Sequence, residues 1–230
     1  MTTVYIISAP SGSGKSTLVN EVRKQVPELD FSISYTTREP RGSERNGCEY
    51  FFVPRSEFAQ MVENDKFLEY ADVFGNCYGT ARRFLDEAKR KGRDLLLDID
   101  VQGAEQIKRK IPEAVSIFIM PPDRKSLEFR LRNRGQDSEN VIQRRLATAS
   151  REIENYGKYD YILVNDRLED SIDLLKSILL AERLKRTGAQ PSADDDTRVA
   201  KAERCRLENV RDRLQPILAS FVPAAAPGGR

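Results

Sequence analysis

The stretch Ala9-Pro-Ser-Gly-Ser-Gly-Lys-Ser16 decides the fold, because it lies between a short apolar run and a segment with helical character. The run Val4–Ser8 before it predicts a buried strand, and residues 16–25 after it predict a helix. Gly12 and Gly14 allow backbone N–H groups to turn toward an anion, and the helix N-terminus adds partial positive charge. This strand, loop and helix together predict a phosphate-binding loop.

Two side chains at the end of the loop carry specific chemistry. Lys15 has the length and charge to reach the terminal phosphates of a bound nucleotide, and the Ser16 hydroxyl is suited to Mg²⁺. The strict form of the motif has glycine where this chain has Ala9, which is a mild departure because it adds only a methyl group. The loop is therefore predicted to bind phosphate together with Mg²⁺.

Composition indicates one compact unit with an appendage. At 230 residues with 39% hydrophobic side chains, the chain is long enough to bury a substantial core. Its 38 basic and 36 acidic residues nearly balance, so no overall field attracts nucleic acid and we expect no nucleic-acid partner. No apolar run approaches the roughly 20 residues of a membrane span, and the first residues of this sequence do not have the basic-then-apolar pattern of a signal peptide. We therefore expect a cytoplasmic protein without a membrane partner.

Cysteine and histidine usage narrows the chemistry further. The three cysteines are scattered without the spacing of a zinc site, which predicts reduced thiols. Histidine is absent, and this excludes triads and metal sites built on histidine. Phosphoryl transfer remains, because an acceptor that is already an anionic phosphate needs mainly positioning and charge neutralisation by Lys, Arg and Mg²⁺.

Strand and helix patterns alternate along the rest of the chain. Strands are predicted over 95–99, 115–120 and 161–164, and helices over 81–91, 101–110, 125–133, 138–156 and 168–185. This alternation predicts an α/β fold with a doubly wound parallel sheet, helices on both faces and ligands at the carboxyl ends of the strands. The aromatic-rich segments 31–35, 49–53 and 67–73 predict a small antiparallel insertion.

A second anion site is predicted in the segment 36–50. Arg38, Arg41 and Tyr50 lie within it, and Tyr78 adds another hydroxyl, so the set suits a phosphate group. Solvated surface charge is the usual explanation of an isolated arginine pair. Because the chain already carries one phosphate loop, a second anion site is the better interpretation here.

The stretch Leu97-Asp-Ile-Asp100 is predicted to end a buried strand with two carboxylates. Asp98 and Asp100 stand at alternate positions and are predicted to point to the same face. A buried acidic pair is costly, so we expect both to line a site. Asp98 is placed like a carboxylate that helps to hold hydrated Mg²⁺, and an ordinary strand-end pair is the alternative.

Arginine-rich helices flank a glycine-containing turn between residues 130 and 151. Such a segment is suited to close over two anionic substrates, to exclude water and to bring guanidiniums to the transferring group. Not every arginine in it is expected to take part. Arg132, Arg144 and Arg151 are predicted to be ordinary surface residues.

From about Val4 to Lys185 the chain resembles the guanylate kinases, which phosphorylate GMP. The matching residues occur in the family's order: Ser11-Gly-Ser-Gly-Lys-Ser16, Ser34, Thr37-Arg38, Pro40-Arg41, Glu44, Gly47, Tyr50, Glu69, Tyr78-Gly-Thr80, Asp98-Ile-Asp100, Arg130-Leu131, Arg134-Gly135, Arg145-Leu146 and Asn165-Asp166. Three positions depart from the family's usual pattern, namely Ala9, Ser43 and Cys77. The resemblance implies ATP as phosphoryl donor, GMP as acceptor and Mg²⁺ as cofactor.

The resemblance also implies roles for individual residues. GMP would be bound by Ser34, Arg38, Arg41, Glu44, Tyr50, Glu69, Tyr78, Thr80 and Asp100. ATP would be bound by Ala9, Pro10, Ser11, Gly12, Ser13, Gly14, Lys15, Ser16, Thr17 and Asn165. The transferring phosphoryl would be neutralised by Lys15, Arg130, Arg134 and Arg145, and the metal would be held by Ser16 and, through water, by Asp98. Carboxylates suit the N1 and N2 donors of guanine and hydroxyls suit O6, whereas adenine would leave these groups unpaired.

The resemblance implies a guanylate kinase-like domain over 1–187, with a GMP-binding insertion at about 34–80 and a lid at about 124–151. Residues 188–230 lie outside it. The segment 188–196 is predicted to be a linker, and an apolar stripe over 199–221 predicts one amphipathic helix that Pro216 kinks or ends. Residues 223–230 are predicted to be disordered. The extension is compatible with docking on the core, with a homo-oligomer or with binding another protein, and docking or fraying without function is the simplest expectation.

Two other functions stay open at this point. A related kinase acting on another phosphorylated sugar or nucleotide would share the phosphate loop, but Ser34, Glu69, Thr80 and Asp100 argue against it. A guanylate-kinase-like module that binds phosphopeptides at the GMP site would have no need of Lys15 or the lid arginines. The sequence therefore predicts an ATP-dependent guanylate kinase.

Overall fold

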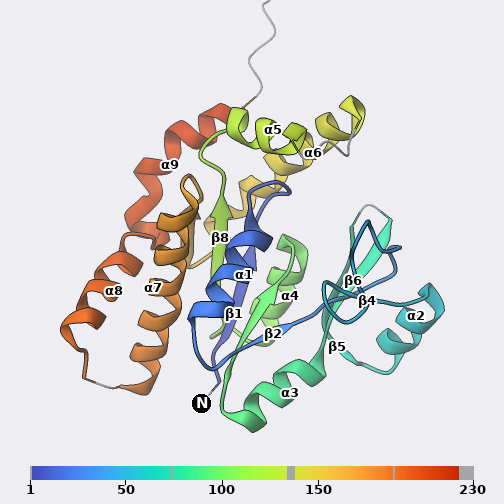
Figure 1. Ribbon diagram of the computed structural model, residues 1–230, viewed down its shortest axis with the longest axis horizontal. Coiled ribbons are helices and arrows are strands. Elements are labelled where there is room, and N and C mark those ends of the chain that lie inside the picture. The colour runs from blue at the N-terminus through green and yellow to red at the C-terminus, as the bar shows by residue number, and fades with distance from the viewer. Residues whose placement is uncertain (1, 74, 134–137, 189, 223–230) are drawn as a thin grey trace, which may run out of the picture. The chain divides into compact units, whose positions relative to one another are not determined.

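The structure is a computed structural model that describes residues 2–73, 75–133, 138–188 and 190–222 (Figure 1). The chain divides into two compact units. The first contains Met1–Ser8 and Arg23–Ser116, and the second contains Ala9–Val22 and Ile117–Arg230. Arg134, predicted to be catalytic, and the segment 223–230 lie outside the described residues.

The first unit contains three strands of the parallel sheet. They are β2 (Leu29–Ser32), β7 (Asp94–Asp98) and β1 (Val4–Ser8), paired in that order. All five residues of β1 are buried, as expected for a parallel strand covered on both faces. Ile7 pairs with Asp98, so the carboxyl ends of β1 and β7 are level. The register places Asp98 at the edge where ligands of such sheets bind.

The second sheet of this unit carries two of the three aromatic-rich segments and the end of the third. Phe31 and Ser32 of that third segment belong to β2 of the parallel sheet, so the prediction of its place in the insertion is wrong for them. The strands of the second sheet are β3 (Tyr35–Thr36), β4 (Phe51–Phe52), β5 (Phe67–Val73) and β6 (Asn76–Ala81). Their order is β4-β3-β6-β5, and β3 pairs with β4 in parallel while the other pairs are antiparallel. The prediction of an antiparallel insertion is therefore wrong in one pair, because the long connection between β3 and β4 returns the chain in the same direction.

Helices complete the first unit. They are α2 (Arg55–Glu63), α3 (Arg82–Lys91) and α4 (Val101–Lys110). The sequence did not predict α2, which packs through Phe58 on Phe67 with ring centroids 4.6 Å apart. Helix α3 ends at Lys91, as predicted, and the next residue, Gly92, has a φ of 65° that favours glycine. The strand predicted over 95–99 ends at Asp98, and Asp100 caps α4 instead of extending the strand.

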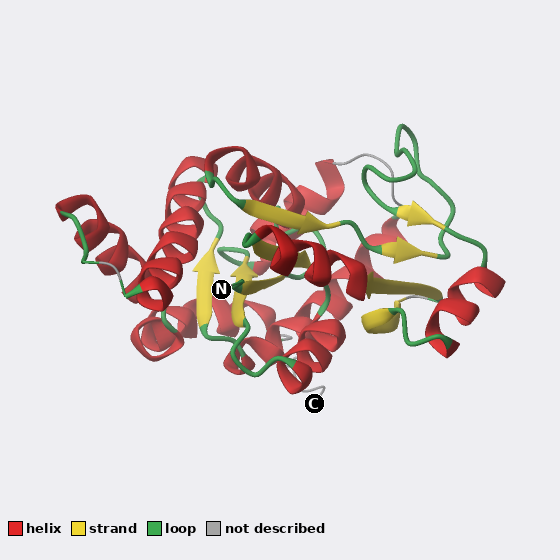
Figure 2. Cartoon of the chain, turned by 90° about the horizontal axis from the view of Figure 1, so that it is seen from below, coloured by secondary structure: helices red, strands yellow, loops and turns green. Residues whose placement is uncertain are grey.

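Most residues of the remaining strands and helices belong to the second unit, and residues 23–25 and 115–116, at the ends of two of these elements, belong to the first. Figure 2 draws the helices red and the strands yellow. Strands β8 (Val115–Met120) and β9 (Tyr161–Val164) pair in parallel, so the predicted α/β class with a parallel sheet is confirmed. The helices are α1 (Lys15–Gln25), α5 (Arg124–Asn133), α6 (Glu139–Ile153), the 3₁₀ helix η1 (Glu154–Lys158), α7 (Leu168–Thr187), α8 (Ala193–Glu203) and α9 (Leu207–Phe221).

The C-terminal extension differs from its prediction in two respects. The expected linker is shorter, because Ser192 and Asp195 form a capping box that starts α8 at Ala193. The expected single helix is two helices, and Pro216 does not end the second, which continues to Phe221. The apolar stripe is nonetheless real, since Val210, Leu214 and Phe221 are buried.

Across the described ranges, we find no helix that combines the length and apolar character needed to span a bilayer.

Candidate active site

The phosphate-binding loop has the backbone geometry that its glycines predict. Gly12 and Gly14 have φ values of 92° and 87°, which side-chain-bearing residues rarely adopt. Ser13 N donates to Pro10 O at 3.1 Å, and Leu18 N donates to Gly14 O at 3.1 Å at the start of α1. Lys15 is half-buried, whereas the hydroxyls of the first turn belong to exposed residues. The loop therefore presents a helix N-terminus in the form that binds phosphate.

Two side chains from other elements hold this loop in place. Asn165, which directly follows β9 and is only 5% exposed, donates from Nδ2 to Ser13 O at 2.7 Å. Arg130 of α5 donates from Nη1 to the same oxygen at 3.4 Å and from Nη2 to Asn165 O at 2.9 Å. Both residues thus contact the backbone of the loop. Their predicted roles toward the transferring phosphoryl and ATP stay predictions.

The close packing of the loop explains why both glycines lack side chains. A Cβ on Gly14 would lie 2.5 Å from Asn165 Nδ2, and a Cβ on Gly12 would lie 2.8 Å from Leu131 Cδ2. Either atom would overlap its neighbour, in addition to the strain of a positive φ. Helix α5 and the residue after β9 therefore fit directly against the loop.

The lid arginines differ in their surroundings. Arg145 is half-buried on α6, whereas Arg144 and Arg151 are exposed, as predicted for surface residues. Arg132 pairs with Glu128 at 2.7 Å and with Glu139 at 2.6 Å. These two carboxylates raise the pKa of Arg132 above its ordinary value, with Glu139 the larger cause. Arg132 thus holds α5 and α6 together at the surface.

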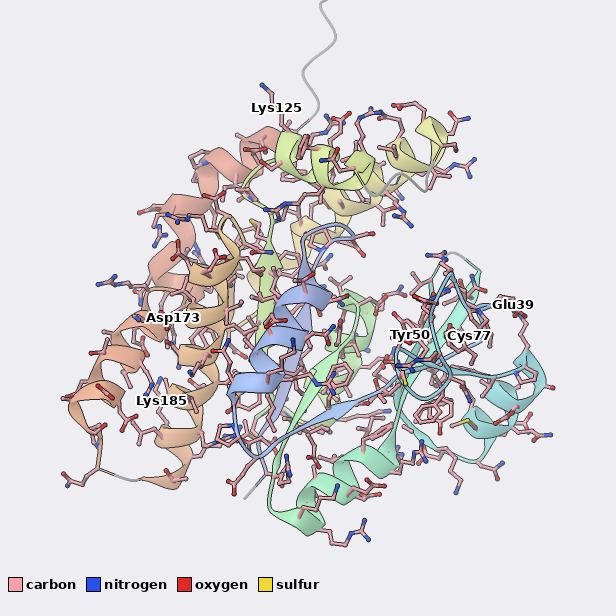
Figure 3. All side chains as sticks on the ribbon, in the orientation of Figure 1. Glu39, Tyr50, Cys77, Lys125, Asp173 and Lys185 are labelled. Atoms are coloured by element: carbon pink, nitrogen blue, oxygen red, sulfur yellow. The ribbon has the colours of Figure 1, made fainter. Side chains whose placement is uncertain are left out.

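In the first unit, Arg38 lies at the centre of the predicted second anion site. Its Nε donates to the Tyr78 hydroxyl at 3.2 Å, and its Nη2 donates to Glu44 Oε1 at 3.0 Å. The guanidinium carbon lies 5.4 Å from the centroid of the Tyr50 ring, and the Tyr50 and Tyr78 rings are 5.8 Å apart. Figure 3 labels Tyr50 in this region. The structure therefore brings one of the two predicted guanidiniums, that of Arg38, together with both phenols, whereas Arg41 is exposed.

Glu44 organises this cluster. One carboxylate oxygen accepts from Arg38, and the other accepts from the backbone N–H of Arg41 at 2.8 Å. The same carboxylate therefore fixes the guanidinium of one arginine and the backbone of the other. The predicted contact of Glu44 with GMP stays a prediction. In the structure Glu44 supports Arg38 and the backbone of Arg41.

The predicted base-reading residues Glu69, Thr80 and Asp100 also come together. Glu69 on β5 is 4% exposed, and the Thr80 hydroxyl on β6 donates to Glu69 Oε1 at 2.6 Å. Asp100 Oδ1 accepts from Gly103 N at 2.8 Å and caps α4. Ser34 lies half-buried between β2 and β3, and its carbonyl accepts from Phe51 N at 2.9 Å. Its predicted contact with guanine stays a prediction.

Burial changes the protonation of Glu69. Desolvation raises the pKa of this carboxyl to about 7, and the charge of Asp100 also raises it, against the hydrogen bond from Thr80, which lowers it. Burial therefore favours the protonated form of this carboxyl. A ligand that offers N–H donors would favour its ionised form.

Sequence reasoning missed the importance of Gly103. A Cβ at this position would lie 2.5 Å from Glu69 Oε2 and 3.3 Å from Asp100 Oδ1. The absence of a side chain on α4 therefore makes room for the buried carboxylate. A glycine in the first turn after an aspartate N-cap was the only signal in the sequence, and it does not reveal which side chain it faces.

The oxygen donors predicted for the metal lie on different units. Ser16 is exposed in the first turn of α1, and Asp98 is half-buried at the end of β7. Within the described ranges, no group of three or more Cys, Asp or Glu side chains is arranged to hold a metal. Mg²⁺ commonly takes only one or two protein oxygens together with water and substrate phosphates.

Known guanylate kinases are similar to this chain in sequence and in fold. The guanylate kinase family model matches residues 1–182. A guanylate kinase from Koribacter versatilis is 56% identical over 98% of this chain and 98% of its own length. One from Escherichia coli K12 is 51% identical over 80% of this chain and 89% of its own. The crystal structure of guanylate kinase from Anaplasma phagocytophilum, 36% identical, has a TM-score of 0.67 and covers 80% of this chain and 87% of that one.

Proposed function

This chain belongs to the guanylate kinase family, and from that premise we propose how its own residues divide the transfer of a phosphoryl group from ATP to GMP. It is an ATP-dependent nucleoside monophosphate kinase whose products are ADP and GDP. The first unit is assigned to GMP and the second to ATP. Within them, residues of about 34–80 form the GMP-binding insertion, and residues of about 124–151 form the lid.

The GMP phosphate is bound by Arg38, Arg41, Tyr50 and Tyr78. Support comes from the cluster around Arg38, whose Nε and Nη2 already engage a phenol and a carboxylate. Because Glu44 fixes Arg38 in this position, little side-chain entropy is lost when the phosphate arrives. An arginine and two phenols also give this site directional donors for a phosphate.

Guanine is recognised by Glu69, Thr80, Asp100 and Ser34. The buried pair Thr80–Glu69 supports this assignment, because a carboxylate that is 4% exposed and has a raised pKa is costly unless a ligand satisfies it. Ionised Glu69 accepts from the N–H donors of guanine. Adenine has no such donors at the corresponding positions, so it would leave a desolvated carboxylate unpaired.

The triphosphate of ATP is bound by the loop 9–17, and Asn165 holds this loop through its hydrogen bond to Ser13 O. The buried Ser13 hydroxyl has no hydrogen-bond partner among the described residues, which is consistent with a donor held ready for a ligand. Lys15, Arg130 and Arg145 neutralise the charge of the transferring group, and Arg134 is assigned the same task. No general base is required, because the acceptor oxygen belongs to an anionic phosphate.

The donor set fits Mg²⁺, which the family's ATP chemistry generally needs. Ser16 would supply a hydroxyl oxygen and Asp98 a carboxylate that acts through water, and both are the hard ligands that Mg²⁺ prefers. When bound, the ion neutralises phosphate charge. The residues of the chain then hold the two nucleotides in position and exclude water.

The observation that carries this proposal is the buried Thr80–Glu69 pair beside Asp100. A coupled assay of ADP release across GMP, dGMP, AMP, UMP and CMP tests it directly. A clear preference for guanine nucleotides is expected. Comparable rates with AMP would show that these residues do not read the base, and absence of turnover with every acceptor would contradict the catalytic assignment.

A further inference from the structure

Helices α8 and α9 lie beyond residue 182, where the family match ends. The connection between them adds a short antiparallel bridge to β9, the last strand in the sheet order. Ile162 N donates to Cys205 O at 2.8 Å, and Leu207 N donates to Asp160 O at 3.2 Å. The edge of the strand that precedes Asn165 is therefore covered by the extension.

An ionic cluster fixes this connection. Arg206 Nη2 lies 2.8 Å from Glu182 Oε1 on α7, and its guanidinium carbon lies 4.6 Å from the centroid of the Tyr161 ring. The Tyr161 hydroxyl donates to the same carboxylate. With side chains 26% and 13% exposed, Arg206 and Glu182 are better protected from solvent than an ordinary surface pair.

Two salt bridges that involve lysines attach α8 to α7. Lys185 lies 3.0 Å from Glu203, and Lys201 lies 2.6 Å from Asp173 on α7. Figure 3 labels Asp173 and Lys185. The extension is thus held by several charged contacts along α7 as well as by backbone bonds to β9.

The far end of α9 contacts α5. Ser220 Oγ accepts from the backbone N–H of Arg124, the first residue of α5, at 3.0 Å. Helix N-termini leave such donors unsatisfied, so Ser220 acts as a cap that comes from another helix. Val210, Leu214 and Phe221 form the buried face of α9. Asn165, directly after β9, and Arg130, on α5, both donate to the Ser13 carbonyl. The extension therefore contacts both of the elements that position these two side chains.

We propose that the C-terminal extension is a positioning element for the phosphate-binding loop. It holds β9 through Arg206 and α5 through Ser220, and these elements hold the loop through Asn165 and Arg130. The ligand whose binding it affects is a nucleoside triphosphate or diphosphate, through the phosphates that this loop binds. The inference rests on the assignment of ATP to this loop, and it adds a role for a segment outside the family match.

The test uses full-length variants with mild substitutions. Ser220→Ala removes the acceptor for Arg124 N, and Arg206→Gln removes the charge that pairs with Glu182. Ser220→Thr keeps a hydroxyl and serves as the rescue variant. Ser177→Ala is the matched control, because its hydroxyl donates only within α7, to Asp173 O at 2.7 Å. ADP affinity is measured by calorimetry, the two KM values by steady-state kinetics, and exchange of loop amides by mass spectrometry.

Ser220→Ala and Arg206→Gln are expected to weaken ADP binding and to raise KM for ATP by roughly twofold to tenfold, the range set by loss of a cap or a protected ion pair. KM for GMP should stay near the wild-type value. Amides in peptides covering 10–18 should exchange faster, whereas Ser220→Thr and Ser177→Ala should behave as wild type.

Unchanged ADP affinity and loop exchange in both variants would overturn the proposal, and so would equal increases in the two KM values. A purely structural role would lower thermal stability without separating the substrates. ADP binding also distinguishes this proposal from the proposed function. Wild-type protein that binds ADP but does not phosphorylate GMP would contradict the function alone.

Discussion

Gly103→Ala tests the geometry of the base-reading site at a residue that makes no polar contact through a side chain. The new Cβ would lie 2.5 Å from Glu69 Oε2 and 2.9 Å from its carboxyl carbon. Ordinary contact begins at 3.4 Å, so the carboxylate must move by about 1 Å. The Thr80–Glu69 hydrogen bond, now 2.6 Å, would then be lost or badly bent.

The expected cost follows from that bond. A hydrogen bond to a charged group contributes about 1.5–3 kcal/mol, and each 1.36 kcal/mol is a factor of ten. We therefore expect kcat/KM for GMP to fall by about tenfold to a hundredfold, with KM for ATP little changed, in steady-state assays of ADP release. Gly157→Ala is the matched control, because a Cβ there meets nothing within 4 Å. A Gly103→Ala enzyme that folds normally and keeps kcat/KM for GMP within twofold of wild type would show that the position of the Glu69 carboxylate does not control activity on GMP.

Two further predictions concern the first unit. Arg38→Ala should raise KM for GMP by at least about tenfold while KM for ATP stays near its wild-type value, because a charge-assisted contact is lost on one substrate only. Equal increases in the two KM values would mean that Arg38 stabilises the fold and does not bind the GMP phosphate. Folding raises the pKa of Glu69 from 4.5 to about 7, so the folded state binds a proton more tightly than the unfolded state does. The free energy of unfolding of the ligand-free protein should therefore fall by roughly 3 kcal/mol as pH rises from about 4.5 to about 7. Glu69→Gln should lack that component, which urea unfolding at several pH values measures, and parallel pH profiles for the two proteins would contradict it.

Local signals predicted the parallel core well. Helix α4 and strand β8 have the predicted bounds, because an apolar run or a change of periodicity marks both ends. Asp100 was misplaced because an aspartate after a strand either continues it or caps the next helix, and only the bond to Gly103 N decides between them. Only the start of α8 was assigned to the linker, because its run of aspartates resembles a polar loop, although these residues form the acidic first turn of a capped helix.

The candidate site was predictable as a set of residues but not as a set of contacts. The residue type alone indicates that Arg38 suits a phosphate and that Glu69 suits N–H donors. The bond from Asn165 to Ser13 O joins positions 152 residues apart, and the parallel pairing of β3 with β4 depends on the path of the intervening loop. Such pairings are set by tertiary packing, which no local pattern encodes. The contact between Gly103 and Glu69 belongs to the same class.

The ratio of kcat/KM for GMP over AMP, measured in wild type and in Glu69→Gln, tests whether Glu69 reads guanine. The amide keeps the shape of the side chain but replaces part of its acceptor capacity with a donor that would face the donors of guanine. We expect wild type to prefer GMP strongly and the substitution to lower that ratio by about tenfold to a hundredfold, the cost of an unpaired buried polar group, through loss of GMP activity alone. A ratio that the substitution leaves unchanged, or a wild type that does not prefer GMP, would contradict this role of Glu69.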